Sequence, residues 1–162
     1  MALKINKKFF ILAGETSGDY IGSSIIRGLK EKEGENSIFF DIGGSLMKKE
    51  GLRSLYEMND FNIIGLMNTI YNYKKLNNHK NSIVKNIFEE KPDAIITIDT
   101  KGFSLALAKK LKTLFKKSDF KCPLIHFVPP TIWAYGQSRI NKWRNLHDGL
   151  FCLFKNEEEF FN

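Results

Sequence analysis

Short runs of consecutive apolar residues, separated by stretches with helical periodicity, constrain most strongly what this chain can fold into. Phe9–Ala13, Ala94–Ile98 and Leu150–Phe154 are such runs, and Ser37–Ile42 and Pro123–Val128 have the same character. Continuous apolar runs of this length are typical of parallel strands that are buried on both faces. The sequence therefore predicts several strands in the middle layer of a sheet covered by helices.

Helices are predicted between these strands. Residues 19–32 carry isoleucines and a leucine at helical spacing, Pro92 ends the helix that precedes the third strand, and another helix is expected near 138–146. The helix over 103–115 has lysines on one face and an apolar stripe on the other, formed by Leu107, Ala108, Leu111, Leu114 and Phe115. This alternation predicts an α/β fold over residues 1–162, with a doubly wound, mostly parallel sheet and helices on both faces.

The composition is that of a soluble globular domain. The 162 residues are 43% hydrophobic and 27% charged, which excludes a disordered chain and a disulfide-stapled miniprotein. Cys122 and Cys152 lie in apolar surroundings and are expected to be buried, reduced thiols. No apolar run approaches the ~20 residues that span a bilayer. A signal-peptide pattern is also absent, so we expect a cytoplasmic protein whose membrane contact is peripheral.

The net charge of +7 allows three kinds of anionic partner: nucleic acid, an anionic membrane, or a phosphorylated substrate. A biased genome explains the charge equally well, because lysine, asparagine, isoleucine and phenylalanine share A/T-rich codons. The lysines are scattered over several predicted helices rather than gathered on one reading helix. We therefore expect no nucleic-acid partner.

Four loops follow the carboxyl ends of predicted strands, where ligands bind in sheets of this class. The first contains Gly14, Glu15, Ser17, Gly18 and Asp19. It matches neither a Rossmann fingerprint nor a P-loop, and its two acidic residues would repel a phosphate. A sugar hydroxyl or an amine fits this loop better. The alternative is that Ser17 and Asp19 only cap the helix that follows.

Asp99 is the candidate general base, because this carboxylate directly follows an apolar strand and would be partly withdrawn from water. The alternative is a residue that caps the next helix. Glycines at positions 43 and 44 follow another strand and would allow close approach of a ligand.

The fourth loop joins a diproline to aromatic residues. His126, Trp133 and Tyr135 could offer stacking surface, and Arg139 and Lys142 lie three residues apart on one helix face, where they could clamp a phosphate. Core packing and a solvated basic face are equally simple interpretations, and a histidine at a strand end is more often structural. We find no spacing that indicates a metal site or a hydrolase triad, and we expect no metal and no cofactor.

Four segments match, in order, the motifs of a known family. Residues 13–19 match A-G-E-x-S-G-D. The segment that runs from Asp41-Ile42-Gly43-Gly44 through Met47 to Gly51 corresponds to G-I-G-G-x-x-M-x-x-x-G. The family's K-P-D and I-D recur within residues 91–99. Residues 125–142 resemble I-H-Y-V-x-P-S-x-W-A-W-x-x-x-R-x-x-K. The chain thus resembles the N-terminal half of the lipid-A-disaccharide synthase family, inverting glycosyltransferases of glycosyltransferase-B architecture.

This resemblance implies an enzyme of lipid A biosynthesis in a Gram-negative bacterium. The implied reaction transfers 2,3-diacylglucosamine from its UDP derivative to 2,3-diacylglucosamine 1-phosphate, with Asp99 as base and Arg139 and Lys142 at the acceptor phosphate. A second acid after the family's Ile-Asp is absent, because this chain has Lys101-Gly102-Phe103 there. The donor-binding domain of the family would follow residue 162, so the chain alone is expected to be inactive. Its oligomeric state is open.

Two other functions remain open on the sequence alone. One is another UDP-hexosamine glycosyltransferase or epimerase, and the other is a non-enzymatic, flavodoxin-like binding module. Diacylated substrates also predict a peripheral contact with the cytoplasmic face of the inner membrane, within residues 61–75. The alternative for that segment is a helix buried on both sides. The side chains expected to face the membrane are Ile64, Leu66, Met67, Ile70, Tyr73, Lys74 and Lys75.

Overall fold

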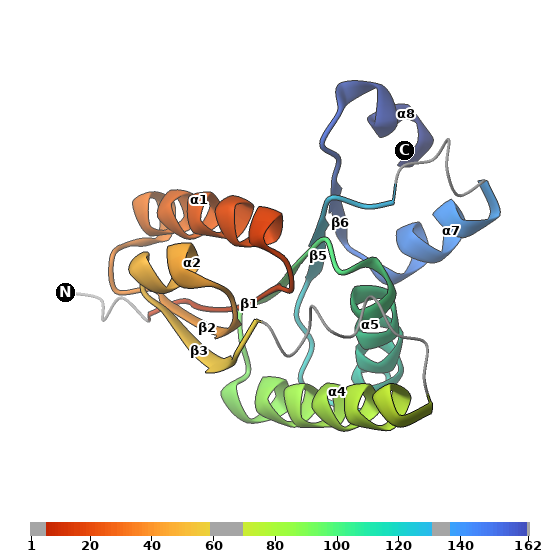
Figure 1. Ribbon diagram of the computed structural model, residues 1–162, viewed down its shortest axis with the longest axis horizontal. Coiled ribbons are helices and arrows are strands. Elements are labelled where there is room, and N and C mark those ends of the chain that lie inside the picture. Colours follow the sequence, from red (N-terminus) through yellow and green to blue (C-terminus); the bar gives the residue numbers. More distant parts are fainter. Residues whose placement is uncertain (1–5, 59–69, 131–136, 162) are drawn as a thin grey trace.

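The computed structural model describes residues 6–58, 70–130 and 137–161, and the chain folds around a six-stranded, all-parallel sheet (Figure 1). The spatial order of the strands is β3-β2-β1-β4-β5-β6. Chain order runs outward from β1 in one direction and then outward from β4 in the other, which is the doubly wound arrangement predicted from the sequence. The strands are β1 (Lys8–Ala13), β2 (Ile38–Ile42), β3 (Leu52–Tyr56), β4 (Ala94–Ile98), β5 (Leu124–Phe127) and β6 (Gly149–Phe151).

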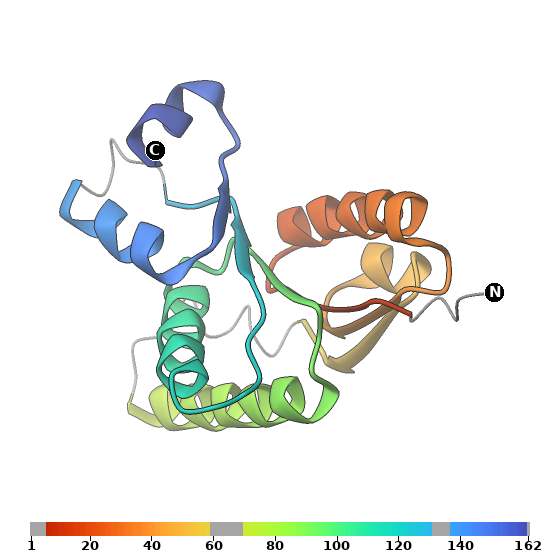
Figure 2. The ribbon, with the colours of Figure 1, turned by 180° about the vertical axis from the view of Figure 1, so that it is seen from behind.

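The helices cover both faces of the sheet, as expected (Figures 1 and 2). On one face, α1 packs with α2 against β1, β3 and β4, while α4, α5 and α7 belong to the other face. A short 3₁₀ helix, η1, and the helix α8 follow β6. The bounds are α1 (Thr16–Glu33), α2 (Ser45–Lys49), α4 (Ile70–Glu90), α5 (Lys101–Phe115), α7 (Gln137–Leu146), η1 (Lys155–Glu157) and α8 (Glu158–Phe161).

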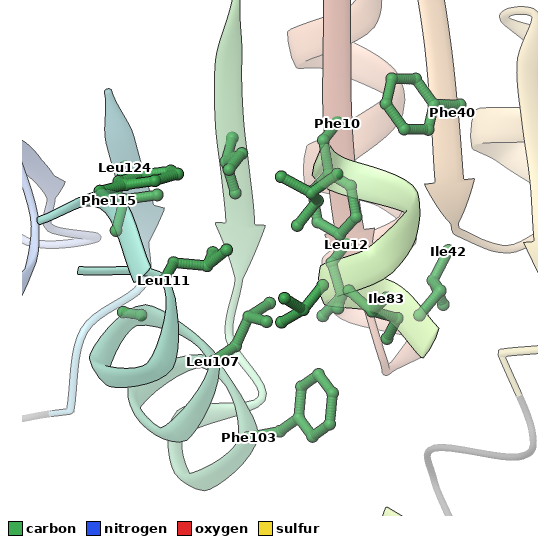
Figure 3. Packing of buried hydrophobic residues seen from close by; sticks show 14 residues of the cluster. Phe10, Leu12, Phe40, Ile42, Ile83, Phe103, Leu107, Leu111, Phe115 and Leu124 are labelled. Carbon is green, nitrogen blue, oxygen red and sulfur yellow. The ribbon is translucent and has the colours of Figure 1, made fainter. Parts of the chain in front are cut away.

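Two apolar clusters lie on the two faces of the sheet. The cluster in Figure 3 joins β1 and β2 to α4 and α5, with Phe10, Leu12 and Ile83 fully buried at its centre. The other joins the opposite faces of the same strands to α1 and α2, through Ile11 and Ile26. Because β1 is buried on both faces, its sequence is a continuous apolar run rather than an alternating one. At ~25 cal/mol per Å² of buried apolar surface, these two layers are the main favourable contribution to folding.

The sequence missed two elements and misplaced the end of a third. The helix α2 has only five residues, and β3 is an edge strand in which the exposed Arg53 and Leu55 alternate with buried or half-buried residues. The last strand was expected over Leu150–Phe154 but ends at Phe151, and Leu153 and Phe154 are 57% and 58% exposed. In the described part of the chain, no helix has both the length and the apolarity that crossing a membrane requires.

Candidate functional site

The carboxyl ends of β1 and β4 meet at the point where the winding of the sheet reverses. Ala13 pairs with Ile98 at the ends of these strands, so Gly14 and Asp99 leave the sheet side by side. The connections on the two sides of this point run over opposite faces of the sheet, and open α/β sheets bind ligands in a crevice at such a point. This arrangement brings together the first and third loops that the sequence singled out.

Asp99 stands at this switch point with its side chain 22% exposed. Its backbone N–H donates a hydrogen bond to the carbonyl of Phe127 (3.0 Å), and the Lys101 ammonium lies 3.7 Å from its Oδ1. The N-cap residue of α5 is Thr100, and no side chain donates or accepts a capping hydrogen bond there. The helix-capping alternative for Asp99 is therefore wrong.

The backbone around Asp99 is held in a conformation that non-glycine residues rarely adopt. Asp99 and Thr100 have φ values of 53° and 42°, and Val128, at the end of the adjacent β5, has 64°. Each such residue costs on the order of 1–3 kcal/mol and is concentrated at functional sites. The hydroxyl of Ser104 braces the turn, because it contacts the Thr100 hydroxyl (2.8 Å) and donates to the Asp99 carbonyl (3.2 Å). Sequence reasoning missed these supporting residues; only their proximity to Asp99 could have indicated them.

The first loop presents three exposed side chains, Glu15, Thr16 and Ser17, while Gly14 and Gly18 are buried. A Cβ on Gly18 would lie 3.3 Å from the Ala13 Cβ and 3.5 Å from Ile98 Cγ2. The absence of a side chain at Gly18 therefore lets α1 begin directly against the ends of β1 and β4. The N-cap residue of α1 is Glu15, without a side-chain capping bond, so capping of α1 by Ser17 or Asp19 is also wrong.

Asp19 caps a different helix. Its carboxylate is 3% exposed and accepts hydrogen bonds from the backbone N–H groups of Gly44 (2.9 Å), Leu46 (3.0 Å) and Met47 (3.0 Å). These are N-terminal groups of α2, whose helix dipole also favours a negative charge. The predicted substrate contact is thus replaced by an internal one, in which Asp19 holds the loop after β2 against α1.

The two glycines after β2 serve this same packing. A Cβ on Gly43 would lie 2.6 Å from Leu52 Cδ2 and 2.7 Å from the sulfur of Met47, and a Cβ on Gly44 would collide with the carboxylate of Asp19. Both glycines are buried. The close approach that they allow is between parts of this chain, and the sequence had assigned it to a ligand.

His126 lies inside the protein. Its side chain is fully buried, with Nδ1 2.8 Å from the Thr97 hydroxyl and the ring 4.5 Å from that of Trp143. Burial, helped by the charge of His147, lowers the pKa of His126 to about 3, so the ring is neutral. These contacts favour the structural interpretation of His126.

The remaining predicted site residues lie in or near α7. Lys142 is exposed on this helix, opposite the inward-facing Ile140 and Trp143. Arg139 lies in the first turn of α7, and its side chain is not described. Trp133 and Tyr135 lie outside the described residues.

The membrane-facing candidates Ile64, Leu66 and Met67 also lie outside the described residues. The other four candidates, Ile70, Tyr73, Lys74 and Lys75, lie in α4, and their side chains are not described.

Two hollows in the described part of the chain lie away from Asp99. One, of about 440 Å³, is bounded by the end of α7, by β6 and by α8. The other, of about 640 Å³, opens beside Cys122 and Lys112. Burial, together with the charge of Asp148, raises the pKa of the Cys122 thiol to about 12, so this thiol is protonated and unreactive.

The described residues contain no group of three or more histidine, cysteine or acidic side chains that could hold a metal ion.

Comparisons with known proteins agree on one family. The family model described as lipid-A-disaccharide synthetase matches residues 9–162. Among curated relatives, the lipid-A-disaccharide synthase of Gluconobacter oxydans is 33% identical over 98% of this chain, and that of Rickettsia akari is 37% identical over 95%. A probable mitochondrial lipid-A-disaccharide synthase of Arabidopsis thaliana is 36% identical over 93%. The chain spans only 34% to 38% of the length of these relatives. By the match over nearly its whole length, the chain belongs to the lipid-A-disaccharide synthetase family.

Proposed function

We propose that this chain forms the acceptor side of a glycosyltransferase of lipid A biosynthesis. The reaction transfers 2,3-diacylglucosamine from UDP-2,3-diacylglucosamine to 2,3-diacylglucosamine 1-phosphate, giving the lipid A disaccharide 1-phosphate and UDP. The observation that carries the proposal is the place of Asp99, at the switch point of the sheet beside the exposed Glu15 and Ser17, in a chain of this family. A domain equivalent to the remaining length of the relatives supplies the donor site.

In this mechanism Asp99 accepts the proton of the acceptor's 6-hydroxyl as that oxygen attacks the anomeric carbon of the donor. The new glycosidic bond forms as the bond to UDP breaks, and the configuration at the anomeric carbon inverts. The strained backbone at Asp99 and the hydroxyl of Ser104, which donates to the Asp99 carbonyl, hold the main chain from which the carboxylate projects. Preorganisation of this kind removes a cost that would otherwise fall on the transition state.

The acceptor sugar binds along the first loop. Glu15 and Ser17 are exposed there and offer hydrogen-bond partners for sugar hydroxyls, while the buried Gly14 and Gly18 keep the backbone close to the sheet. Asp19 contributes indirectly, because it holds the loop after β2 in place. Arg139 and Lys142 of α7 bind the acceptor phosphate.

The test compares the chain alone with a completed enzyme. The 162-residue chain fused to the remaining part of the Rickettsia akari relative should form disaccharide, and the chain alone should not exceed a no-protein control, because half of the cleft is missing. In the fusion, Asp99→Asn should lower kcat about 10²–10⁴-fold with little change in KM. Asp119→Asn, at an exposed acid that follows the C-terminal end of α5, is the matched control. A near-normal kcat for Asp99→Asn would remove Asp99 from the mechanism.

We also propose that the enzyme draws its diacylated substrates from the cytoplasmic face of the inner membrane through residues 61–75. Lys80 of α4 lies near Lys110 of α5, and burial and the charge of Lys110 both lower the pKa of Lys80. Lysines near anionic lipid add up to about 1 kcal/mol each. Replacing Leu66 and Met67 by serine, and Lys74 and Lys75 by glutamine, should release a folded protein from anionic vesicles in a sedimentation assay. Unchanged binding of that variant, or no binding of the parent chain, would show that residues 61–75 belong to the core and do not contact the membrane.

A further inference from the structure

The hollow of about 640 Å³ lies at the end of the sheet opposite to Asp99. It forms where the end of α5 turns back into the start of β5, and Cys122 and Pro123 directly precede that strand (Figures 1 and 2). Asp99 follows the carboxyl end of β4, which is parallel to β5, so the two features lie at opposite strand ends. Small-molecule sites commonly have volumes of roughly 300–1,000 Å³. The proposed reaction makes no use of this hollow.

Part of the lining of the hollow is apolar and firmly packed. Phe115 is 5% exposed and belongs to the cluster of Figure 3, and its ring centroid lies 5.9 Å from that of Phe88 and 5.6 Å from that of Phe120. The half-buried Cys122 and Pro123 add to the apolar lining. Because neighbouring rings already support Phe115, little ordering of side chains opposes the binding of a ligand.

The charged side chains of the lining are mainly basic. Three are lysines, Lys112, Lys116 and Lys121, and one is an acid, Asp148. The ammonium of Lys112 lies 2.8 and 3.0 Å from the two carboxylate oxygens of Asp148, which also accepts a hydrogen bond from the backbone N–H of Leu124. The charge of the acid is therefore balanced within the protein. Lys116 and Lys121 are exposed and form no ion pair with another described residue, so two positive charges remain beside the apolar lining.

The chemistry of the lining indicates which ligand fits. An apolar surface beside two unpaired ammonium groups suits a molecule with an alkyl chain and an anionic head, because the methylene stems of lysines also cover apolar surface. Among the described residues of the lining, none is serine, threonine, asparagine, glutamine or arginine. A nucleotide or a sugar phosphate would therefore find few hydrogen-bond partners there. A flat membrane surface cannot enter a hollow, so the ligand that fits is a single molecule.

We propose that this hollow is a binding site for a single-chain acyl anion, of which a fatty-acid carboxylate is the simplest form. The alkyl chain lies against Phe115 and Pro123, and Lys116 and Lys121 hold the carboxylate. The site goes beyond the proposed transfer reaction, because it lies at the opposite end of the sheet from Asp99 and can be filled whether or not that reaction takes place.

The two cysteines give the experiment an internal control. Cys122 lines the proposed site, and Cys152 lines the other hollow. Mass spectrometry on the 162-residue chain measures the rate at which the neutral reagent iodoacetamide alkylates each thiol. Labelling is carried out near pH ~9, because both thiols have raised pKa values and only the thiolate reacts. Dodecanoate below its micelle concentration is the probe, and dodecanol, butyrate and inorganic phosphate are the comparison compounds.

Dodecanoate at about ten times its dissociation constant should slow the alkylation of Cys122 by about 10-fold, because only the empty site reacts, and should leave that of Cys152 unchanged. Dodecanol should protect Cys122 only at higher concentrations, since it lacks the charge. Butyrate and phosphate should not protect Cys122, since neither carries a long alkyl chain.

The double variant Lys116→Gln/Lys121→Gln should weaken the affinity for dodecanoate about 5- to 10-fold. Lys32→Gln/Lys49→Gln is the matched control, because it removes the same charge from exposed lysines of α1 and α2, on the other face of the sheet, and should leave the affinity unchanged. Equal slowing at both cysteines, equal weakening in both variants, or protection by dodecanol as strong as by dodecanoate would overturn the proposal. Protection of Cys122 by anionic vesicles but not by dodecanoate would also overturn it and would assign the surface to a membrane.

Discussion

Two aspartates are buried at neighbouring places in this protein and have opposite surroundings. Asp19, on α1, is 3% exposed and accepts three backbone hydrogen bonds from the start of α2. Asp41, in β2, is fully buried between Ile11 of β1 and Ser54 of β3, and neither of its carboxylate oxygens has a partner among the described residues. Burial raises the pKa of Asp41 well above its usual value. The difference teaches that the hydrogen-bond donors around a buried acid, rather than its burial, decide whether it stabilises the fold.

The backbone adds to the contrast. Asp41 has a φ of 121°, a region that favours glycine, and it stands at the first glycine of the family's G-I-G-G motif. Its carbonyl is satisfied by the Ser54 hydroxyl, so the side chain is the unsatisfied part. Asp19, by contrast, lies in regular helix, and its cost of burial is offset by the dipole and the N–H groups of α2.

The largest expected effect is that of removing the satisfied carboxylate. Asp19→Ala leaves three backbone N–H groups without their acceptor, and it should lower the free energy of unfolding by about 3–5 kcal/mol. Chemical denaturation measures this loss. Asp19→Asn keeps one carbonyl acceptor and should lose roughly half as much. A loss below ~1 kcal/mol for Asp19→Ala would mean that α2 finds other partners.

The next effect tests the close approach that the Asp19 contact needs. Gly44→Ala would place a methyl group against the Asp19 carboxylate, and we expect a loss of about 2 kcal/mol from overpacking. Gly28→Ala is the matched control: Gly28 is exposed within α1 and has no atom within 4 Å of its Cβ position. The control should gain about 0.5–1 kcal/mol. Thermal melts of both variants that shift in the same direction would contradict this assignment.

Removal of the unsatisfied carboxylate should act in the opposite direction. Asp41→Gly relieves the strained φ and the unpaired oxygens, and we expect a net gain of about 1–2 kcal/mol after the lost packing. For a chain of this size that corresponds to a rise in Tm of a few degrees. If Asp41→Gly instead destabilised the protein, the carboxyl group would have a partner that the described residues do not include.

The smallest effect is a difference in pH dependence. Above pH 3.8 the carboxyl group of Asp41 has lost its proton in the unfolded chain but keeps it in the folded protein. The contribution of Asp41 to stability therefore falls as the pH rises from 3.8 through its folded pKa. Asp41→Asn lacks this loss, so chemical denaturation should show its stability relative to the parent increasing by roughly 1 kcal/mol per pH unit between pH 3.8 and the folded pKa. His126 and His147 have the opposite dependence, but they are present in both proteins and cancel. A constant difference over this range would show that Asp41 is ionised in the fold.

The sequence predicted the elements whose patterns are long and local. The strands β1 and β4 are continuous apolar runs, and α1 and α5 carry strong helical periodicity, so each was predicted within a few residues. It missed α2, which is too short to show a period, and β3, whose mixed polar and apolar residues suit an edge. In the candidate site, the positions of Gly14 and Asp99 followed from the strand-end rule alone, because parallel strands place their carboxyl ends at one edge of the sheet.

Contacts between distant segments were decided only by the tertiary structure. Asp19 and Gly44 lie 25 residues apart, and nothing in either local sequence indicates that the acid of one loop satisfies the amides of the other. The burial of His126 and Asp41 likewise depends on which strands and helices cover them. The sequence by itself determined the parallel α/β fold and the place of Asp99, because apolar periodicity and strand polarity are properties of the local chain. The partners of each buried polar group were decided by packing, because hydrogen bonds depend on where separate segments meet in space.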